Sequence, residues 1–185
     1  MRMFRASQQF ISTHIQHILT NVKEQEIDHI IDSFFQAKRI FVYGAGRSGL
    51  VARAFAIRLV HLGFQTFVIG ETIGAPVKKD DLVFLISGSG ETIPAVMTAD
   101  IAHGIGACVV VITGEKQSKI TKNANISLIL APTNEDVKQK SYAPLGTLFE
   151  ASAWILLDSI IAELMDRKHE TEESMRSRHA TLELP

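Results

Sequence analysis

The sequence of 185 residues contains one cysteine, no long apolar run and almost no net charge. A single cysteine excludes an intramolecular disulfide, and the apolar run around Cys108 predicts a small core residue. No stretch has the length of a membrane span, and Met1–Arg5 lacks the apolar core of a signal peptide. A formal net charge of −1 favours neither nucleic acid nor an anionic membrane. We therefore expect a cytoplasmic protein without nucleic-acid or membrane partners.

The sequence also lacks the usual patterns of metal and nucleotide sites. Neither the cysteine nor any of the seven histidines has a partner at metal-ligand spacing. His14 and His17 lie three residues apart, but no nearby Asp or Glu completes a site. No Gly-Lys-Ser/Thr motif is present, so hydrolysis of a nucleoside triphosphate is not expected. These absences predict a protein that works without a metal.

Short apolar runs alternate with helical patterns from residue 40 onward. The runs are apolar throughout rather than alternating, which suits strands covered on both faces. Together with two amphipathic helices within 5–36, they predict a single domain over 1–185. The expected fold is a three-layer α/β sandwich around a five-stranded parallel sheet. The expected strands are 40–43, 66–69, 82–86, 108–113 and 126–130, and the expected helices after residue 40 are 49–62, 92–105, 117–124 and 146–166.

The last predicted helix and the tail that follows it differ in polarity. The helix over 146–166 is apolar nearly all round, so it must be buried on most sides, in the centre of the domain or against another subunit. The tail 168–185 is polar and is expected to be a charged, frayed terminus. Arg178-His179 near its end is a candidate arm that reaches a neighbouring subunit.

Two loops rich in glycine and serine follow the first and third predicted strands. Glycine permits close approach of the backbone, and the following helix presents free N–H groups and a favourable dipole to an anion. Two such loops with hydroxyl groups predict one phosphate held from two sides. Arg47 is a candidate partner of that phosphate, although a loop arginine more often pairs with an acid. The predicted binding residues are Gly46, Arg47, Ser48, Ser87, Gly88, Ser89, Gly90, Glu91 and Thr92.

The first loop also matches another type of site. Gly44-x-Gly46-x-x-Gly49 has the form of the dinucleotide-binding fingerprint, and Glu71 lies where a ribose-binding acid is expected. A pyrophosphate, however, does not need the three hydroxyls of Ser87, Ser89 and Thr92. Helix capping accounts for one hydroxyl per helix, not for three in one loop. The second loop therefore favours a phosphate monoester.

Glu150 is the main candidate for proton transfer. It lies in the first turn of an apolar helix, and apolar surroundings disfavour the ionised carboxylate and so tune it as a base. Thr147-x-x-Glu150 is also a capping box, and the spacing leaves both roles open. His179 is the second candidate, because a terminal Arg-His has no evident structural purpose. His61 ends a predicted helix, where an interaction with the helix dipole is the simpler explanation.

Four segments and the tail together resemble a known family. They are 42–49, 58–63, 85–92 and 144–150, followed by Arg178-His179. In these motifs the chain is similar to the 6-phospho-3-hexuloisomerases of the sugar isomerase (SIS) domain family, over nearly its whole length. The second loop is typical of SIS domains in general, whereas the first loop, the 144–150 segment and the tail indicate this isomerase.

The resemblance implies a reaction and an assembly. The reaction interconverts D-arabino-hex-3-ulose 6-phosphate and D-fructose 6-phosphate through an enediolate, within the ribulose monophosphate pathway of formaldehyde fixation. It uses no metal or organic cofactor. Glu150 becomes the expected base, with His179 of a neighbouring subunit moving a proton and His61 a weaker candidate. The expected assembly is a homotetramer with active sites at subunit contacts.

Three other functions stay open at this point. Another SIS isomerase would act on a pentose or heptose phosphate, and a non-catalytic sensor would bind a sugar phosphate. Sensors carry a DNA-binding domain ahead of the SIS domain, and the residues before Ile40 contain no basic cluster. A nicotinamide oxidoreductase would bind a dinucleotide instead. We also expect the loop 70–77 to line the site.

Overall fold

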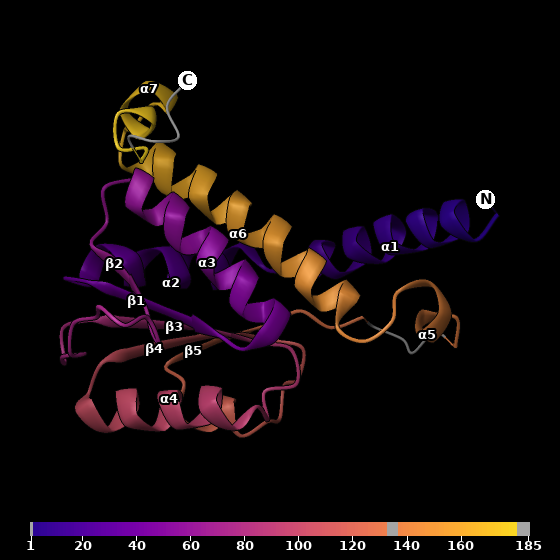
Figure 1. The fold of residues 1–185 in the computed structure, drawn as a ribbon, viewed down its shortest axis with the longest axis horizontal. Coiled ribbons are helices and arrows are strands. Elements are labelled where there is room, and N and C mark those ends of the chain that lie inside the picture. Colours follow the sequence, from indigo (N-terminus) through magenta and orange to yellow (C-terminus); the bar gives the residue numbers. More distant parts are fainter. Residues whose placement is uncertain (1, 133–136, 181–185) are drawn as a thin grey trace.

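In the computed structural model, which describes residues 2–132 and 137–180, a parallel sheet lies between two layers of helices (Figure 1). The five strands have the order β2-β1-β3-β4-β5, and every neighbouring pair is parallel. The predicted fold class is therefore confirmed. The strands are β1 (Ile40–Gly44), β2 (Thr66–Val68), β3 (Leu82–Ser87), β4 (Cys108–Thr113) and β5 (Ile126–Ile129).

The helices divide unequally between the two faces of the sheet. Four helices contribute to the apolar core on one face: α1 (Arg2–Thr20), α2 (Glu24–Gln36), α3 (Gly46–His61) and α6 (Thr147–Arg167). The other face is covered by α4 (Ile93–Ile105) and the 3-10 turn η1 (Ile120–Asn123). Figure 1 shows α3 and α6 running side by side, while α1 extends away from the sheet. No helix of the described residues is long and apolar enough to cross a membrane.

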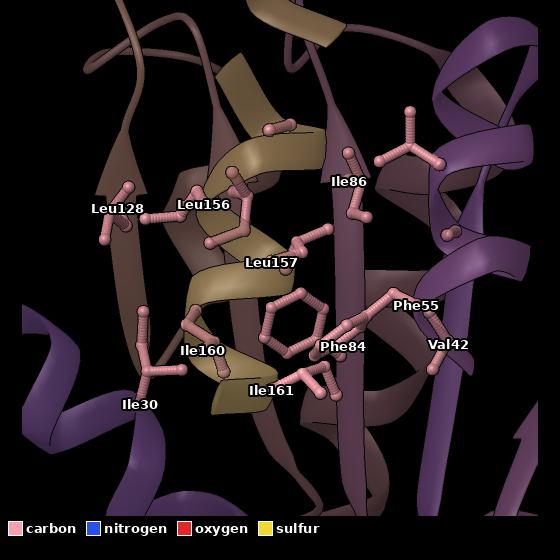
Figure 2. Packing of buried hydrophobic residues seen from close by; sticks show 14 of the residues in the cluster. Ile30, Val42, Phe55, Phe84, Ile86, Leu128, Leu156, Leu157, Ile160 and Ile161 are labelled. Carbon is pink, nitrogen blue, oxygen red and sulfur yellow. The ribbon is translucent and has the colours of Figure 1, made fainter. Parts of the chain in front are cut away.

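The core beneath α6 is built around Phe84, in the middle of β3. Its ring lies 5.6 Å from that of Phe34 in α2 and 5.2 Å from that of Phe55 in α3. Figure 2 shows Leu157 and Ile161 of α6 beside Phe84 on this strand. Every residue of β3 is buried, as its unbroken apolar sequence predicts for a central strand. This packing fixes α3 and α6 relative to the sheet.

The structure differs from the sequence prediction in two short segments. The helix expected over 117–124 is only the short turn η1, and the Ser118 N–H donates to the Thr121 side chain at 3.3 Å. Such side-chain bonds compete with a continuous helix. A further short helix, α5 (Gln139–Tyr142), was not predicted. Cys108 is half-buried at the start of β4, and burial raises the pKa of its thiol.

The prediction of a frayed tail is wrong for residues 168–180. They contain α7 (Glu172–Arg176), which begins with reciprocal hydrogen bonds between Thr171 and Ser174. Arg178 then donates to both carboxylate oxygens of Glu170 at 3.0 Å and to the carbonyl of His61 at 2.9 Å. The tail is thus fastened to the end of α3. Residues 181–185, also part of the predicted tail, lie outside the described residues.

Candidate active site

Both glycine- and serine-rich loops lie at the carboxyl edge of the sheet. From β1 the chain continues to β2 on one side, whereas β3, β4 and β5 follow on the other. The last residue of β1, Gly44, is in register with Ile86, next to the end of β3. The loops that leave these strands therefore begin side by side. Ligands of open α/β sheets bind at this kind of switch point.

The first loop brings the start of α3 against the end of β1. A Cβ on Gly44 would lie 2.6 Å from the carbonyl oxygen of Ser48, and one on Gly49 would lie 2.7 Å from that of Gly44. Both positions therefore require glycine. The helix follows Ala45, which provides no side-chain cap, and Ser48 is buried in its first turn. The first backbone N–H groups of α3 thus have no partner from a capping side chain and suit an anion.

The second loop packs closely against the segment 114–118 that follows β4. Gly90 has φ +64°, and a Cβ there would lie 2.2 Å from the hydroxyl of Ser118. The carbonyl of Gly88 accepts from the Gly114 N–H at 2.9 Å. Ser87 is buried, and its hydroxyl has no hydrogen-bond partner among the described residues. Thr92 is the N-cap of α4, and its side chain makes no capping bond there.

Glu91 has an anchoring role in this loop. Its carboxylate accepts from the Lys119 backbone N–H at 2.9 Å and pairs with the Lys119 ammonium at 2.8 Å. These hydrogen bonds lower the pKa of Glu91. The Glu91 N–H donates to the Ser89 hydroxyl at 3.2 Å. Glu91 was predicted as a binding residue, but its side chain is turned away to fasten the loop to the start of η1.

The first turn of α6 meets both loops. A Cβ on Gly88 would lie 3.0 Å from the ring of Phe149, so this ring packs against the second loop. The next residue, Glu150, lies over Gly146, where a Cβ would be 3.2 Å from the carboxyl group. The alternative capping box is not formed, because the N-cap is Gly146 and Thr147 donates to the carbonyl of Pro144 at 2.6 Å. The Glu150 carboxylate is therefore available for another partner.

That partner is Arg47, in the first turn of α3. Its Nε donates to Oε2 of Glu150 at 2.5 Å. The Arg47 side chain is 67% exposed, whereas that of Glu150 is only 13% exposed. Both line an open cavity of about 440 Å³ between α3 and α6, with Leu50, Val51, Ala151, Trp154 and Ile155. Of the two roles considered for Arg47, the structure shows pairing with an acid, and that acid is the candidate base.

The two histidine candidates lie at the opposite end of α3. His61 is buried in its last turn, and the ring of His179 stacks on it with centroids 4.4 Å apart. The 16 residues of α3 separate this pair from the first loop, a length of about 24 Å at 1.5 Å per residue. Within one chain, neither histidine shares a site with Glu150.

The loop 70–77 does not join the two loops as expected. It borders a separate apolar cavity of about 310 Å³ on the α4 face of the sheet, with Phe41, Phe67 and Ile101 among its other walls. Glu71, at its start, pairs with Arg53 of α3. No group of three or more potential metal ligands occurs in the described parts of the chain.

Comparison with known proteins shows the family of this chain. The model of the SIS domain matches residues 33–152. The chain belongs to the SIS domain family. This confirms the family resemblance seen in the sequence, and the matched residues include both loops and Glu150.

Individual relatives are similar over most of their length. The 3-hexulose-6-phosphate isomerase of Methanocaldococcus jannaschii is 40% identical over 86% of this chain and 85% of its own. That of Bacillus subtilis is 36% identical over 88% and 89%. A crystal structure from Methanococcus jannaschii, for which a function of 3-hexulose-6-phosphate isomerase was inferred, superimposes with a TM-score of 0.85. It is 36% identical and covers 95% of this chain and 98% of that one.

Proposed function

We infer that this protein is a 6-phospho-3-hexuloisomerase, which interconverts D-arabino-hex-3-ulose 6-phosphate and D-fructose 6-phosphate. The observation that carries the proposal is the Glu150 carboxylate, which Arg47 holds beside two glycine- and serine-rich loops at the switch point of the sheet. Relatives from two organisms that cover most of the chain bear the name of this activity. This activity belongs to the ribulose monophosphate pathway of formaldehyde fixation. The proposed protein would therefore serve methylotrophy, the growth on one-carbon compounds, and would act in the cytoplasm.

One carboxylate is sufficient for the chemistry. In the forward direction Glu150 removes the proton from C2 of the 3-ketose, and the electrons form an enediolate across C2 and C3. The same group then returns a proton to C3. The hydroxyl proton on O2 moves to O3, so the carbonyl ends at C2 and no redox partner is needed. A base that lies over both carbons performs both transfers.

Phosphate binding positions the reacting carbons. The proposed donors to the 6-phosphate are the hydroxyls of Ser48, Ser87, Ser89 and Thr92, with the N–H groups of Gly46, Arg47 and Gly88. Binding energy from this remote group holds C2 and C3 near Glu150. The proposal requires no metal or organic cofactor, because the enediolate charge can be stabilised by N–H and guanidinium donors.

We also propose that the protein assembles as a homotetramer with active sites at subunit contacts. Large apolar side chains are exposed on two separate faces. One face carries Leu50, Ile57, Val60, Trp154 and Ile155 of α3 and α6, beside the Glu150 cavity, and the other carries Ile93, Met97 and Ile101 of α4. A tetramer with two-fold symmetry uses two different self-complementary surfaces. A histidine at the far end of α3 can then act only from a neighbouring subunit.

A coupled assay tests the reaction. A hexulose-phosphate synthase makes the 3-ketose from formaldehyde and ribulose 5-phosphate, and product fructose 6-phosphate is followed through glucose-phosphate isomerase and glucose-6-phosphate dehydrogenase. Turnover in the presence of a chelator supports the proposal. Binding of fructose 6-phosphate without turnover would favour another SIS isomerase, of a pentose or heptose phosphate, or a sensor. Binding of a nicotinamide dinucleotide without sugar phosphate would favour an oxidoreductase.

Mixing two inactive variants tests the role of His179. Glu150→Gln and His179→Asn each remove one proposed group from every site of a homo-oligomer. If His179 acts on a neighbouring Glu150, unfolding and refolding the two variants together restores some sites in which both groups are native. Recovery of turnover in the mixture, but not in either variant alone, supports the shared site. Full activity of His179→Asn alone would remove it from the mechanism.

A further inference from the structure

We propose that Arg47 is a positioning residue for Glu150 and that its guanidinium is not a ligand of the substrate phosphate. The inference rests on the proposed isomerase function and concerns the same site. Its basis is the contact between Nε of Arg47 and Oε2 of Glu150 at 2.5 Å, in a structure where both side chains line one cavity.

The carboxylate of Glu150 is fixed from two sides. On one side it lies against Gly146, where the space that a Cβ would take is only 3.2 Å from the carboxyl carbon and Oε1. On the other side the Arg47 guanidinium holds Oε2. Among the described residues, no other hydrogen bond or ion pair of this carboxylate is found. Loss of Arg47 therefore leaves Glu150 free to rotate.

The contact with Glu150 uses the Nε donor of the guanidinium and not its terminal nitrogens. Nε faces Glu150, whereas the side chain as a whole is 67% exposed to the cavity and solvent. The guanidinium has five donors in a rigid plane, so the terminal N–H groups can donate to the negative charge that develops on the substrate oxygens in the transition state while Nε holds the base. A residue in this position orients the base and offers a donor next to the reacting carbons.

The backbone around Arg47 separates it from the phosphate role. Arg47 follows Gly46, which has φ +57°, and its side chain extends from α3 toward α6 and the Glu150 cavity. The second loop instead meets α6 through Phe149 and the segment before η1 through Ser118. The phosphate donors are then the backbone N–H groups and hydroxyls of the two loops, while the cation serves the carboxylate.

Steady-state kinetics of Arg47→Ala and Arg47→Lys test the proposal, with Arg53→Ala as the matched control. Arg53 is also an exposed arginine of α3 in an ion pair, but with Glu71, away from the site. We expect Arg47→Ala to lower kcat by roughly 10²-fold, because a small displacement of a base has this effect. KM should stay within about threefold, as for an interaction that matters mainly in the transition state.

Two further readouts separate positioning from loss of structure. Guanidinium, added below the range that unfolds the protein, should restore part of kcat in Arg47→Ala and leave Arg53→Ala unchanged. Arg47→Lys keeps the charge without the planar Nε geometry, so it should recover only part of the loss. Unchanged kcat in Arg47→Ala, or a loss that guanidinium does not reverse in a variant with native thermal unfolding, would overturn the inference.

Calorimetric titration with fructose 6-phosphate keeps the two proposals distinguishable. Absence of turnover in the unsubstituted protein contradicts the proposed function. The affinity for fructose 6-phosphate tests Arg47 whether or not the protein turns over the substrate. Loss of a phosphate ligand lowers this affinity, whereas loss of a positioning residue does not. Equal affinity of Arg47→Ala and the unsubstituted protein is expected. A tenfold or larger loss of affinity would assign Arg47 to the phosphate and refute the positioning role.

Discussion

The two ends of α3 differ in what their side chains do. At the first turn, Gly46–Ser48 follow an end without a side-chain cap, and Arg47 crosses to Glu150 at the edge of an open cavity. At the last turn, His61 is buried beneath His179, and Arg178 ties its carbonyl to Glu170. The same helix thus has one end open to a ligand and one end closed by the chain's own tail.

The comparison separates groups that carry similar chemistry. Histidine and glutamate are both capable of proton transfer. Glu150 lies beside the two glycine- and serine-rich loops of its own chain, whereas His61 and His179 lie at the far end of α3. The arginines at the two ends also differ, because Arg47 is largely exposed and holds a carboxylate of the cavity, whereas Arg178 closes a structural contact. Substitutions of side chains at the first turn of α3 should therefore affect mainly activity, and those at its last turn mainly stability.

The largest effect is expected from Glu150→Gln at the open end. The amide has nearly the same shape but cannot accept the substrate proton, so turnover should fall roughly 10²–10⁴-fold while fructose 6-phosphate still binds. Glu163→Gln is the matched control, since Glu163 pairs with Arg167 near the other end of α6. Activity within about tenfold of the unsubstituted protein, roughly 1.4 kcal/mol, would place the base elsewhere.

Gly44→Ala should disturb the open end through its backbone. The new Cβ would lie 2.6 Å from the Ser48 carbonyl oxygen, so α3 must move away from β1. We expect a loss of roughly 1–3 kcal/mol in the free energy of unfolding, together with weaker phosphate binding. Chemical denaturation and calorimetric titration measure the two effects.

Gly104→Ala provides the control for that change. Gly104 lies in α4 with nothing within 4 Å of the added Cβ. Alanine favours the helix by about 1 kcal/mol relative to glycine, so this variant should be slightly more stable and equally active. Equal stability of Gly44→Ala and Gly104→Ala would contradict the close packing of the first loop.

Arg178→Gln should release the tail at the closed end. It removes both bonds to Glu170 and the bond to the His61 carbonyl, so the tail should detach. We expect a lower Tm and faster proteolysis after α6, with the binding of fructose 6-phosphate unchanged. Arg176→Gln is the control, because its exposed pair with Glu172 lies within α7. Identical proteolysis of the two variants would exclude the proposed anchor.

A smaller effect is expected from pH. The hydrogen bonds from Arg178 lower the pKa of Glu170 from its ordinary value of 4.5. The contact therefore contributes fully above about pH 4.5 and is lost as the pH falls through the lower pKa of the folded protein. The difference in Tm between the unsubstituted protein and Arg178→Gln should narrow as the pH falls from about 6 to 3. A constant difference would mean that Glu170 is not the partner that matters.

Much of the fold could be predicted from local patterns. Unbroken apolar runs indicated all five strands, because a strand covered on both faces has no polar side to show. The glycine-rich sequences indicated the close approach of α3 to β1, since Gly44 and Gly49 are needed for short-range contacts there. The ordered tail was missed, because the polar segment is fastened to the domain by a contact with the distant residue His61, in addition to its local hydrogen bonds.

The sequence alone determined the alternation of strands and helices and the two loops, since these depend on periodicity and on the conformational freedom of glycine. Only the tertiary structure decided which charged group pairs with the candidate base. Arg47 and Glu150 are 103 residues apart and meet because α3 and α6 begin at the same edge of the sheet. His61 and Ser48 share one helix, but its length keeps them apart. No local spacing encodes such contacts, because they depend on how complete elements pack.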